Sequence, residues 1–221
     1  MKTETLDLRH MDCMELMRSY PDNHFDLAVV DPPYGIGADG TLGFATKKTK
    51  GFTFTAKEYA KKNWDNQTPD IKYFEELKRV SKYQIIWGAN YFANELGVIK
   101  NFIYWHKKGK SEDTKFNEGE LAYVSKGRTR MVDIWWNGFG VINSGEKKQH
   151  PTQKPVKLYD WIFANYAEKG MKILDTHMGS GSIAIAAHYA GMNLTACELD
   201  ADYYKAACER IHRETSQTTF L

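Results

Sequence analysis

The sequence is poor in cysteine and has no long apolar run. Its three cysteines, Cys13, Cys197 and Cys208, are scattered along 221 residues and form no C-x-x-C pair. This pattern argues against a disulfide framework and a zinc site, and it fits a reducing compartment. No apolar run approaches the ~20 residues that span a bilayer, and residues 1–10 lack the apolar core of a secretion signal. We therefore expect a cytoplasmic protein without a membrane partner or a bound metal.

An excess of charge of one sign is also missing. The 30 lysines and arginines nearly balance the 28 aspartates and glutamates, so the net charge of +2 does not by itself indicate a nucleic-acid partner. Aromatic residues make up 14% of the chain, a content that suits stacking on bases. The length allows one domain over residues 1–221 with a sizeable buried core.

Strand-like and helix-like segments alternate along the chain. The apolar patterns predict strands at 5–10, 25–30, 84–88, 102–105, 121–124, 171–175 and 193–197. They predict helices at 14–20, 73–80, 155–170 and 182–189, and a last helix that Asp200 caps. The run at 25–30 is almost continuously apolar, as in a strand buried on both faces. This order predicts an α/β fold with a mainly parallel sheet and helices on both faces.

A glycine turn joins the strand at 171–175 to the next helix. Gly179 and Gly181 let the backbone approach a ligand closely, and Glu198 ends the following strand, where it can accept the hydroxyls of a ribose. The turn also fits the G-x-G-x-x-A form of dinucleotide sites. A carboxylate at Asp175 would repel a pyrophosphate and favour the sulfonium of S-adenosylmethionine. The residues therefore favour S-adenosylmethionine and leave NAD as an alternative.

Three motifs carry a resemblance to a known family. They are D-P-P-Y at 31–34, H-P-T-Q-K-P at 150–155 and D-T-H-M-G-S-G-S at 175–182. In type and order they resemble the circularly permuted β class of DNA amino-methyltransferases, which methylate adenine N6 or cytosine N4. The resemblance covers nearly the whole chain. It implies a Rossmann-like fold that binds S-adenosylmethionine, with double-stranded DNA as the partner, in a bacterial or phage-encoded enzyme of the restriction-modification type.

The resemblance implies that the catalytic residues are Asp31, Pro32, Pro33 and Tyr34. Hydrogen bonds from a base amine to the Asp31 carboxylate and the Pro32 carbonyl would free the nitrogen lone pair for the sulfonium methyl. The two prolines hold that carbonyl in place, and Tyr34 would stack on a base flipped out of the duplex. Asp31 need not act as a strong base, because the amine loses its proton readily once it is methylated.

The same resemblance assigns the cofactor residues. They are Asp12, Thr152, Lys154, Asp175, His177, Met178, Gly179, Ser180, Gly181 and Glu198. In this assignment Asp12 reaches the adenine amine, Glu198 holds the ribose, and Thr152 and Lys154 meet the methionine carboxylate. The family usually has Pro and Phe where Thr176 and His177 stand, and Thr in place of Ser182. A neutral imidazole at His177 would fill the space of that aromatic ring.

Two segments are predicted to contact DNA. Residues 35–66 are rich in glycine and lysine and predict a mobile loop with one helical turn, in which Lys47, Lys48 and Lys50 would contact phosphates. Residues 107–149, with Lys126, Arg128 and Arg130, form the predicted target-recognition segment. Because that segment is short, we expect either a short recognition site or a homodimer.

Several alternatives remain open on sequence alone. D-P-P-Y favours adenine N6 over cytosine N4, but similar clamps occur in methyltransferases that act on RNA or on protein amides. An NAD-dependent dehydrogenase fits the glycine turn, and a non-catalytic DNA-binding module fits the fold. Thermal stabilisation of the protein by S-adenosylmethionine would indicate a methyltransferase, and stabilisation by NAD would indicate a dehydrogenase.

Overall fold

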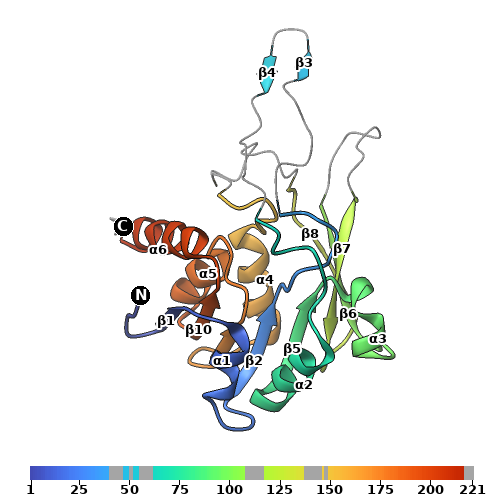
Figure 1. The fold of residues 1–221 in the computed structure, drawn as a ribbon, viewed down its shortest axis with the longest axis vertical. Helices are drawn as coiled ribbons and strands as arrows, with labels where there is room; N and C mark the ends of the chain where they lie inside the picture. The colour runs from blue at the N-terminus through green and yellow to red at the C-terminus, as the bar shows by residue number, and fades with distance from the viewer. Residues whose placement is uncertain are drawn as a thin grey trace.

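A computed structural model describes residues 1–39, 47–49, 52–54, 62–107, 117–136, 146 and 149–216 of the chain (Figure 1). One eight-stranded sheet runs through the molecule in the order β1-β10-β9-β2-β5-β7-β6-β8. Every neighbouring pair from β1 to β5 is parallel, whereas β7 is antiparallel to both β5 and β6, and β6 and β8 are parallel. This confirms the predicted mainly parallel sheet.

The strands of the sheet are β1 (Leu6–His10), β2 (Phe25–Val30), β5 (Ser81–Trp87), β6 (Phe102–His106), β7 (Gly119–Val124), β8 (Arg130–Asp133), β9 (Lys172–Asp175) and β10 (Asn193–Glu198). A separate antiparallel pair joins β3 (Lys47–Thr49) to β4 (Phe52–Phe54). The helices are α1 (Cys13–Arg18), α2 (Ile71–Val80), the 3₁₀ turn η1 (Ala89–Tyr91), α3 (Ala93–Leu96), α4 (Val156–Tyr166), α5 (Ser182–Ala190) and α6 (Ala201–Thr215).

Each face of the sheet carries its own layer of helices. One buried cluster joins α4, α5 and α6 to the sheet, and the other joins α1, α2 and α3 to it. In β2, Leu27 and Val29 belong to the first cluster while Ala28 and Val30 belong to the second, because successive side chains of a strand point to opposite faces. The prediction that β2 is buried on both faces is therefore confirmed.

The connections diverge between β9 and β2. After β9 the chain crosses through α5 to β10, and after β2 it crosses through α2 to β5 on the opposite face. Parallel sheets bind ligands at such a switch point, outside the carboxyl ends of the strands. The loops that follow β1, β2, β5, β9 and β10 meet at this edge, which we call the catalytic edge (Figure 1).

The structure departs from the predicted elements in several places, and it adds two short helical segments, η1 and α3, that were not predicted. Helix α4 ends at Tyr166, before Gly170, because Ala167 leaves the helical conformation after its N–H reaches the Phe163 carbonyl. Strand β8 was not predicted, since only Val132 of its four residues is buried. In the segment 35–66 the described residues contain the β3–β4 hairpin, and the expected helical turn is not among them.

Neither a membrane span nor a metal cluster occurs in the part of the chain that the structure describes. No described helix combines the length and the apolar character that a span requires. The same residues include no group of three or more His, Cys, Asp or Glu side chains placed to hold a metal ion.

Candidate active site

The D-P-P-Y motif follows β2 directly at the catalytic edge. Pro32 is buried, and Asp31 is largely buried beside Tyr34. The Tyr34 hydroxyl donates to Asp31 Oδ1 at 2.5 Å, and the Lys154 ammonium donates to Asp31 Oδ2 at 2.5 Å. Both oxygens of the Asp31 carboxylate therefore have a donor inside the protein.

Lys154 is buried between two carboxylates. Its side chain is 3% exposed, and its Nζ lies 3.2 Å from Glu120 Oε2 in addition to its bond with Asp31. Lys107 pairs with the other oxygen of Glu120. The result is a chain of alternating charges that runs from Lys107 through Glu120 and Lys154 to Asp31.

Burial and neighbouring charge shift the pKa values of these groups in different directions. Burial raises the pKa of Asp31, with Lys154 opposing that rise and Glu120 adding to it. The Lys154 and Lys107 ammonium groups outweigh burial at Glu120 and lower the pKa of that carboxyl to about 2. The paired carboxylates likewise outweigh burial at Lys154 and raise its pKa. Glu120 and Lys154 are thus both charged at neutral pH.

The Tyr34 ring packs closely against Tyr91 and Gly88. It stacks on Tyr91, with ring centroids 4.9 Å apart and planes 15° from parallel. The ring also lies against the backbone of Gly88. This glycine has a φ of +75°, and a Cβ added to it would lie 2.3 Å from Tyr34 Cε1. Only glycine allows both this backbone conformation and this approach of the ring.

Asp65 organises the loop that carries the motif. Its Oδ1 accepts the N–H groups of Tyr34 and Gly35 at 2.7 and 2.8 Å, and its Oδ2 accepts that of Ala38 at 2.7 Å. The Asp65 residue is 1% exposed. One carboxylate therefore satisfies three backbone donors of the motif loop.

The glycine turn follows β9 at the same edge. Gly179 adopts a φ of +51°, and its N–H donates to Glu198 Oε2 at 2.9 Å. Glu198 Oε1 accepts the N–H of Asp200, the N-cap of α6, which confirms the predicted cap. Burial lowers the pKa of His177 to about 4, so its imidazole is neutral at neutral pH.

One cavity of about 460 Å³ joins the motif loop to the glycine turn. Of the predicted site residues, those that line it are Asp12, Asp31, Pro33, Thr152, Lys154, His177, Met178, Gly179, Ser180 and Glu198. Trp64 and Tyr203 line another wall and contact the His150 ring at 5.3 and 4.3 Å between centroids. A ligand in this cavity would touch Asp31 and Glu198 together.

Two predicted cofactor residues lie beneath the cavity. Asp175 is 3% exposed, accepts the His177 N–H at 3.0 Å, and is absent from the lining. Gly181 is the N-cap of α5 and packs against Ile211 of α6, where a Cβ would lie 2.8 Å from Ile211 Cδ1. Both residues support the glycine turn, and neither lines the cavity.

Three of the predicted DNA-binding residues lie away from the catalytic edge. Lys126, Arg128 and Arg130 lie at the opposite end of the sheet, because β7 runs antiparallel to β5 and the turn into β8 points away from Asp31. The Lys126 ammonium there binds the Tyr83 hydroxyl at 2.7 Å. Lys47 and Lys48 belong to β3, and their side chains, like all of Lys50, lie outside the described part of the chain.

Two residues of the site, Asp65 and Glu120, were not predicted from the sequence. Asp65 lies in a segment without periodicity, and only the placement of Tyr34 shows which donors it serves. Glu120 lies at the start of β7, which the reversed direction of that strand brings to the catalytic edge. A charged residue inside an otherwise apolar strand was the available signal for Glu120.

Comparison with known proteins identifies the family. The sequence model of a family described as DNA methylase, the N6/N4 methyltransferases, matches residues 71–209. This is more than half of the chain and includes Glu120, Lys154 and the glycine turn. The chain belongs to this DNA methylase family. Membership confirms the resemblance that the three motifs indicated.

Curated relatives extend the likeness of this methylase over its length. It is 25% identical to the type II methyltransferase M2.MboI of Moraxella bovis, over 92% of this chain and 86% of the relative. It is 26% identical to the type II methyltransferase M2.DpnII of Streptococcus pneumoniae, over 94% and 90%. A putative methylase of Escherichia coli is 23% identical over 90% and 87%.

Solved structures share the fold. The M1.HpyAVI complex with SAM superposes with a TM-score of 0.61 at 18% identity, over 93% of this chain and 99% of that one. The cytosine-N4-specific PvuII DNA methyltransferase superposes with a TM-score of 0.60 at 15% identity, over 96% and 92%. These likenesses confirm the predicted methyltransferase fold.

Proposed function

We propose that this DNA methylase transfers a methyl group from S-adenosylmethionine to the N6 amine of an adenine flipped out of DNA. The observation that carries the proposal is the single cavity that joins Asp31 to Gly179 and Glu198. An amine held at Asp31 and a nucleoside held at Glu198 would share one cavity. Both parts of the transfer reaction require that proximity.

The residues present fit S-adenosylmethionine. Glu198 can accept ribose hydroxyls, His177 and Trp64 offer apolar ring surface, and the glycine turn lets the backbone approach the ligand. The structural neighbours include M1.HpyAVI, described as a complex with SAM, and a putative DNA modification methylase of Thermus thermophilus, described as complexed with S-adenosyl-L-methionine. When bound, S-adenosylmethionine supplies a methyl group on a sulfonium, which is an electrophile for an amine lone pair.

Asp31 and Pro32 would act on the substrate amine. An exocyclic amine is a poor nucleophile because its lone pair is delocalised into the ring. Hydrogen bonds to the Asp31 carboxylate and the Pro32 carbonyl would draw the nitrogen towards a tetrahedral geometry and direct the lone pair into the cavity. Tyr34 and Lys154 already donate to the two oxygens of Asp31, so the amine would share one of these oxygens with a donor that the protein supplies.

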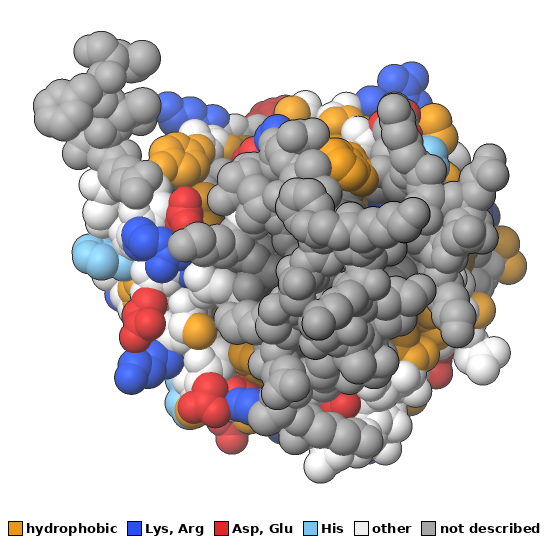
Figure 2. All heavy atoms as spheres, turned by 90° about the horizontal axis from the view of Figure 1, so that it is seen from above, with side chains coloured by type: hydrophobic (Ala, Val, Ile, Leu, Met, Phe, Trp, Pro, Cys, Tyr) orange, Lys and Arg blue, Asp and Glu red, His pale blue; other side chains and the backbone are white. Residues whose placement is uncertain are grey.

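DNA would approach from the catalytic edge. Lys62 and Lys107, which flank segments outside the described residues, lie at this edge and pair with Asp200 and Glu120. Figure 2 shows this face, where described lysine and arginine side chains are interspersed with acidic ones around its margin. We propose that the lysines within 35–66 supply the phosphate contacts, and that a homodimer would add to the recognition surface.

The test is methyl transfer from labelled S-adenosylmethionine to unmethylated DNA, followed by digestion to nucleosides. We expect label in N6-methyldeoxyadenosine, and at least a 100-fold lower rate in Asp31→Ala. Asp22→Ala, which removes a carboxylate that is 72% exposed, serves as the matched control and should keep full activity. Label in cytosine would reassign the base to N4, and absence of label in DNA, with cofactor bound, would refute the proposed acceptor.

A further inference from the structure

Glu120 is a charged residue in an unusual position. It lies in β7, between Gly119 and Leu121, and its backbone pairs with Trp105 of β6. Because β7 runs against its neighbours, its amino end lies with the carboxyl ends of the parallel strands. Its carboxylate therefore reaches the surroundings of Asp31 from a strand that contributes no other charged side chain.

Both oxygens of Glu120 face ammonium groups. Lys107 pairs with Oε1, and Lys154 Nζ lies 3.2 Å from Oε2, which is itself buried. Lys154 is therefore shared between Glu120 and Asp31, at 3.2 and 2.5 Å. The Lys154 ammonium also lies 5.6 Å from the centre of the Tyr34 ring.

A substrate amine competes with Lys154 for Asp31. Tyr34 donates to Oδ1 and Lys154 to Oδ2, so an amine that binds either oxygen weakens a bond that the protein already makes. A buried ammonium that loses its only counter-charge is strongly destabilised. With Glu120 in place, Lys154 keeps a carboxylate partner while Asp31 engages the substrate.

We propose that Glu120 is a positioning residue: it holds Lys154 in the site so that Asp31 can be released to the substrate amine. The proposal rests on the proposed role of Asp31 as the acceptor of that amine. Glu120 touches neither the amine nor the cofactor in this scheme. It acts through Lys154.

The proposal predicts a specific change in the pH profile. The groups that face this network are Lys107 after β6, Tyr34 after β2, Tyr159 on α4 and Asp175 at the end of β9. Within the network itself, the negative charge of Glu120 adds to the effect of burial and raises the pKa of Asp31. Neutralising Glu120 should therefore lower that pKa and move the acid limb of kcat/KM to lower pH, which a merely structural role would not do.

The experiment compares Glu120→Gln with Glu118→Gln, which removes the same charge from an exposed side chain two residues away. We expect kcat of Glu120→Gln to fall about 10- to 100-fold, with KM for S-adenosylmethionine nearly unchanged and the acid limb shifted downward. Glu118→Gln should match the wild type. Wild-type kcat and a wild-type acid limb in Glu120→Gln would overturn the proposal.

Two further measurements separate the possible failures. Glu120→Asp keeps the charge, so it should retain the wild-type acid limb and recover part of kcat; equal behaviour of the Asp and Gln variants would count against positioning. In ligand-free protein, chemical acetylation followed by mass spectrometry should show Lys154 more reactive in Glu120→Gln and unchanged in Glu118→Gln. A wild-type protein that is inactive on DNA would instead refute the proposed function, and the Lys154 reactivity would still report whether Glu120 holds this lysine.

Discussion

Asp65 offers a sharp test of how the site is held together. Its carboxylate is the common acceptor for the N–H groups of Tyr34, Gly35 and Ala38, with distances between 2.7 and 2.8 Å. Asp65→Ala would leave all three donors without this acceptor. Asp65→Asn would keep one oxygen and turn an NH₂ group towards the remaining donors.

The magnitude follows from the three bonds. A hydrogen bond to a charged group contributes about 1.5 kcal/mol at the lower end of the usual range, so the loss of three such bonds predicts that Asp65→Ala lowers the free energy of unfolding by about 4.5 kcal/mol. Asp65→Asn should cost about half as much. Because the same bonds place Tyr34, methyl transfer should fall at least 10-fold in both variants.

Urea unfolding and methyl transfer, measured on the same preparations, check both effects. Asp22→Asn is the control, because Asp22 is exposed and its ion pair with Arg79 lies at the surface; we expect a change below about 1 kcal/mol. An Asp65→Ala protein within 1 kcal/mol of the wild type, with full activity, would refute the idea that this carboxylate holds the motif loop.

Two further predictions concern Gly88 and Asp175. Gly88→Ala should abolish activity and destabilise the fold, because the new Cβ would lie 2.3 Å from the Tyr34 ring. Gly97→Ala is the control, because Gly97 has a similar φ of +68° but no atom near its added Cβ. Backbone strain in this control should lower the free energy of unfolding by only about 1–3 kcal/mol and leave activity unchanged. If the two alanine variants proved equally active, the contact with Tyr34 would not matter. Burial raises the pKa of Asp175 from 3.8 to about 8, so the folded protein holds a proton that the unfolded chain releases, and the free energy of unfolding should fall as the pH rises between these values. A cation bound in the cavity favours the ionised form of Asp175, so calorimetry at pH 7 should detect proton release when S-adenosylmethionine binds. The affinity for S-adenosylmethionine should rise towards pH 8. In Asp175→Asn this affinity should depend less on pH. Binding without proton release would show that Asp175 does not respond to the cofactor.

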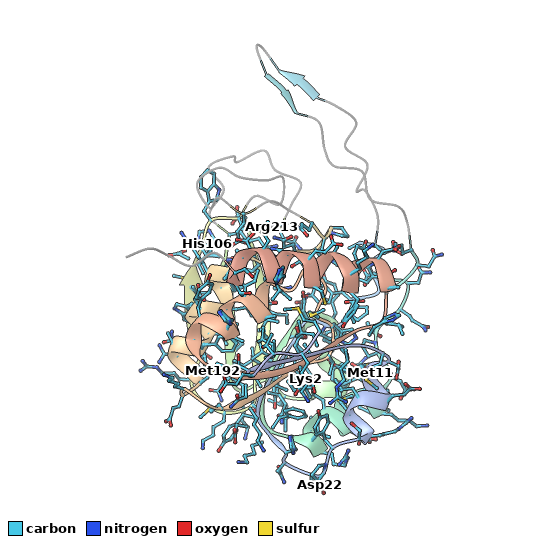
Figure 3. The ribbon with its side chains drawn as sticks, turned by 90° about the vertical axis from the view of Figure 1, so that its left-hand side faces the viewer. Lys2, Met11, Asp22, His106, Met192 and Arg213 are labelled. Atoms are coloured by element: carbon cyan, nitrogen blue, oxygen red, sulfur yellow. The ribbon has the colours of Figure 1, made fainter. Side chains whose placement is uncertain are left out.

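The sequence by itself determined the family and most of the fold. The runs at 25–30 and 171–175 are short, apolar and bounded by turn residues, and local patterns of this kind predict buried strands well. The motifs around Asp31, Lys154 and Gly179 are short runs of sequence in a characteristic order. The family could therefore be identified without knowing which of these residues contact one another. The sequence also predicted that Asp200 caps the last helix, as it does in α6. This helix lies across one side of the molecule (Figure 3).

Tertiary structure decided which charges meet. Lys154, assigned from its motif to the cofactor's carboxylate, is bound here to Asp31 across 123 residues and to Glu120 across the sheet. The direction of β7 is set by long-range pairing, and that direction carries Glu120 towards the catalytic edge while it carries Lys126 away. Local sequence patterns report burial and periodicity, but partner choice between distant side chains depends on strand order and orientation, which no short stretch of sequence contains.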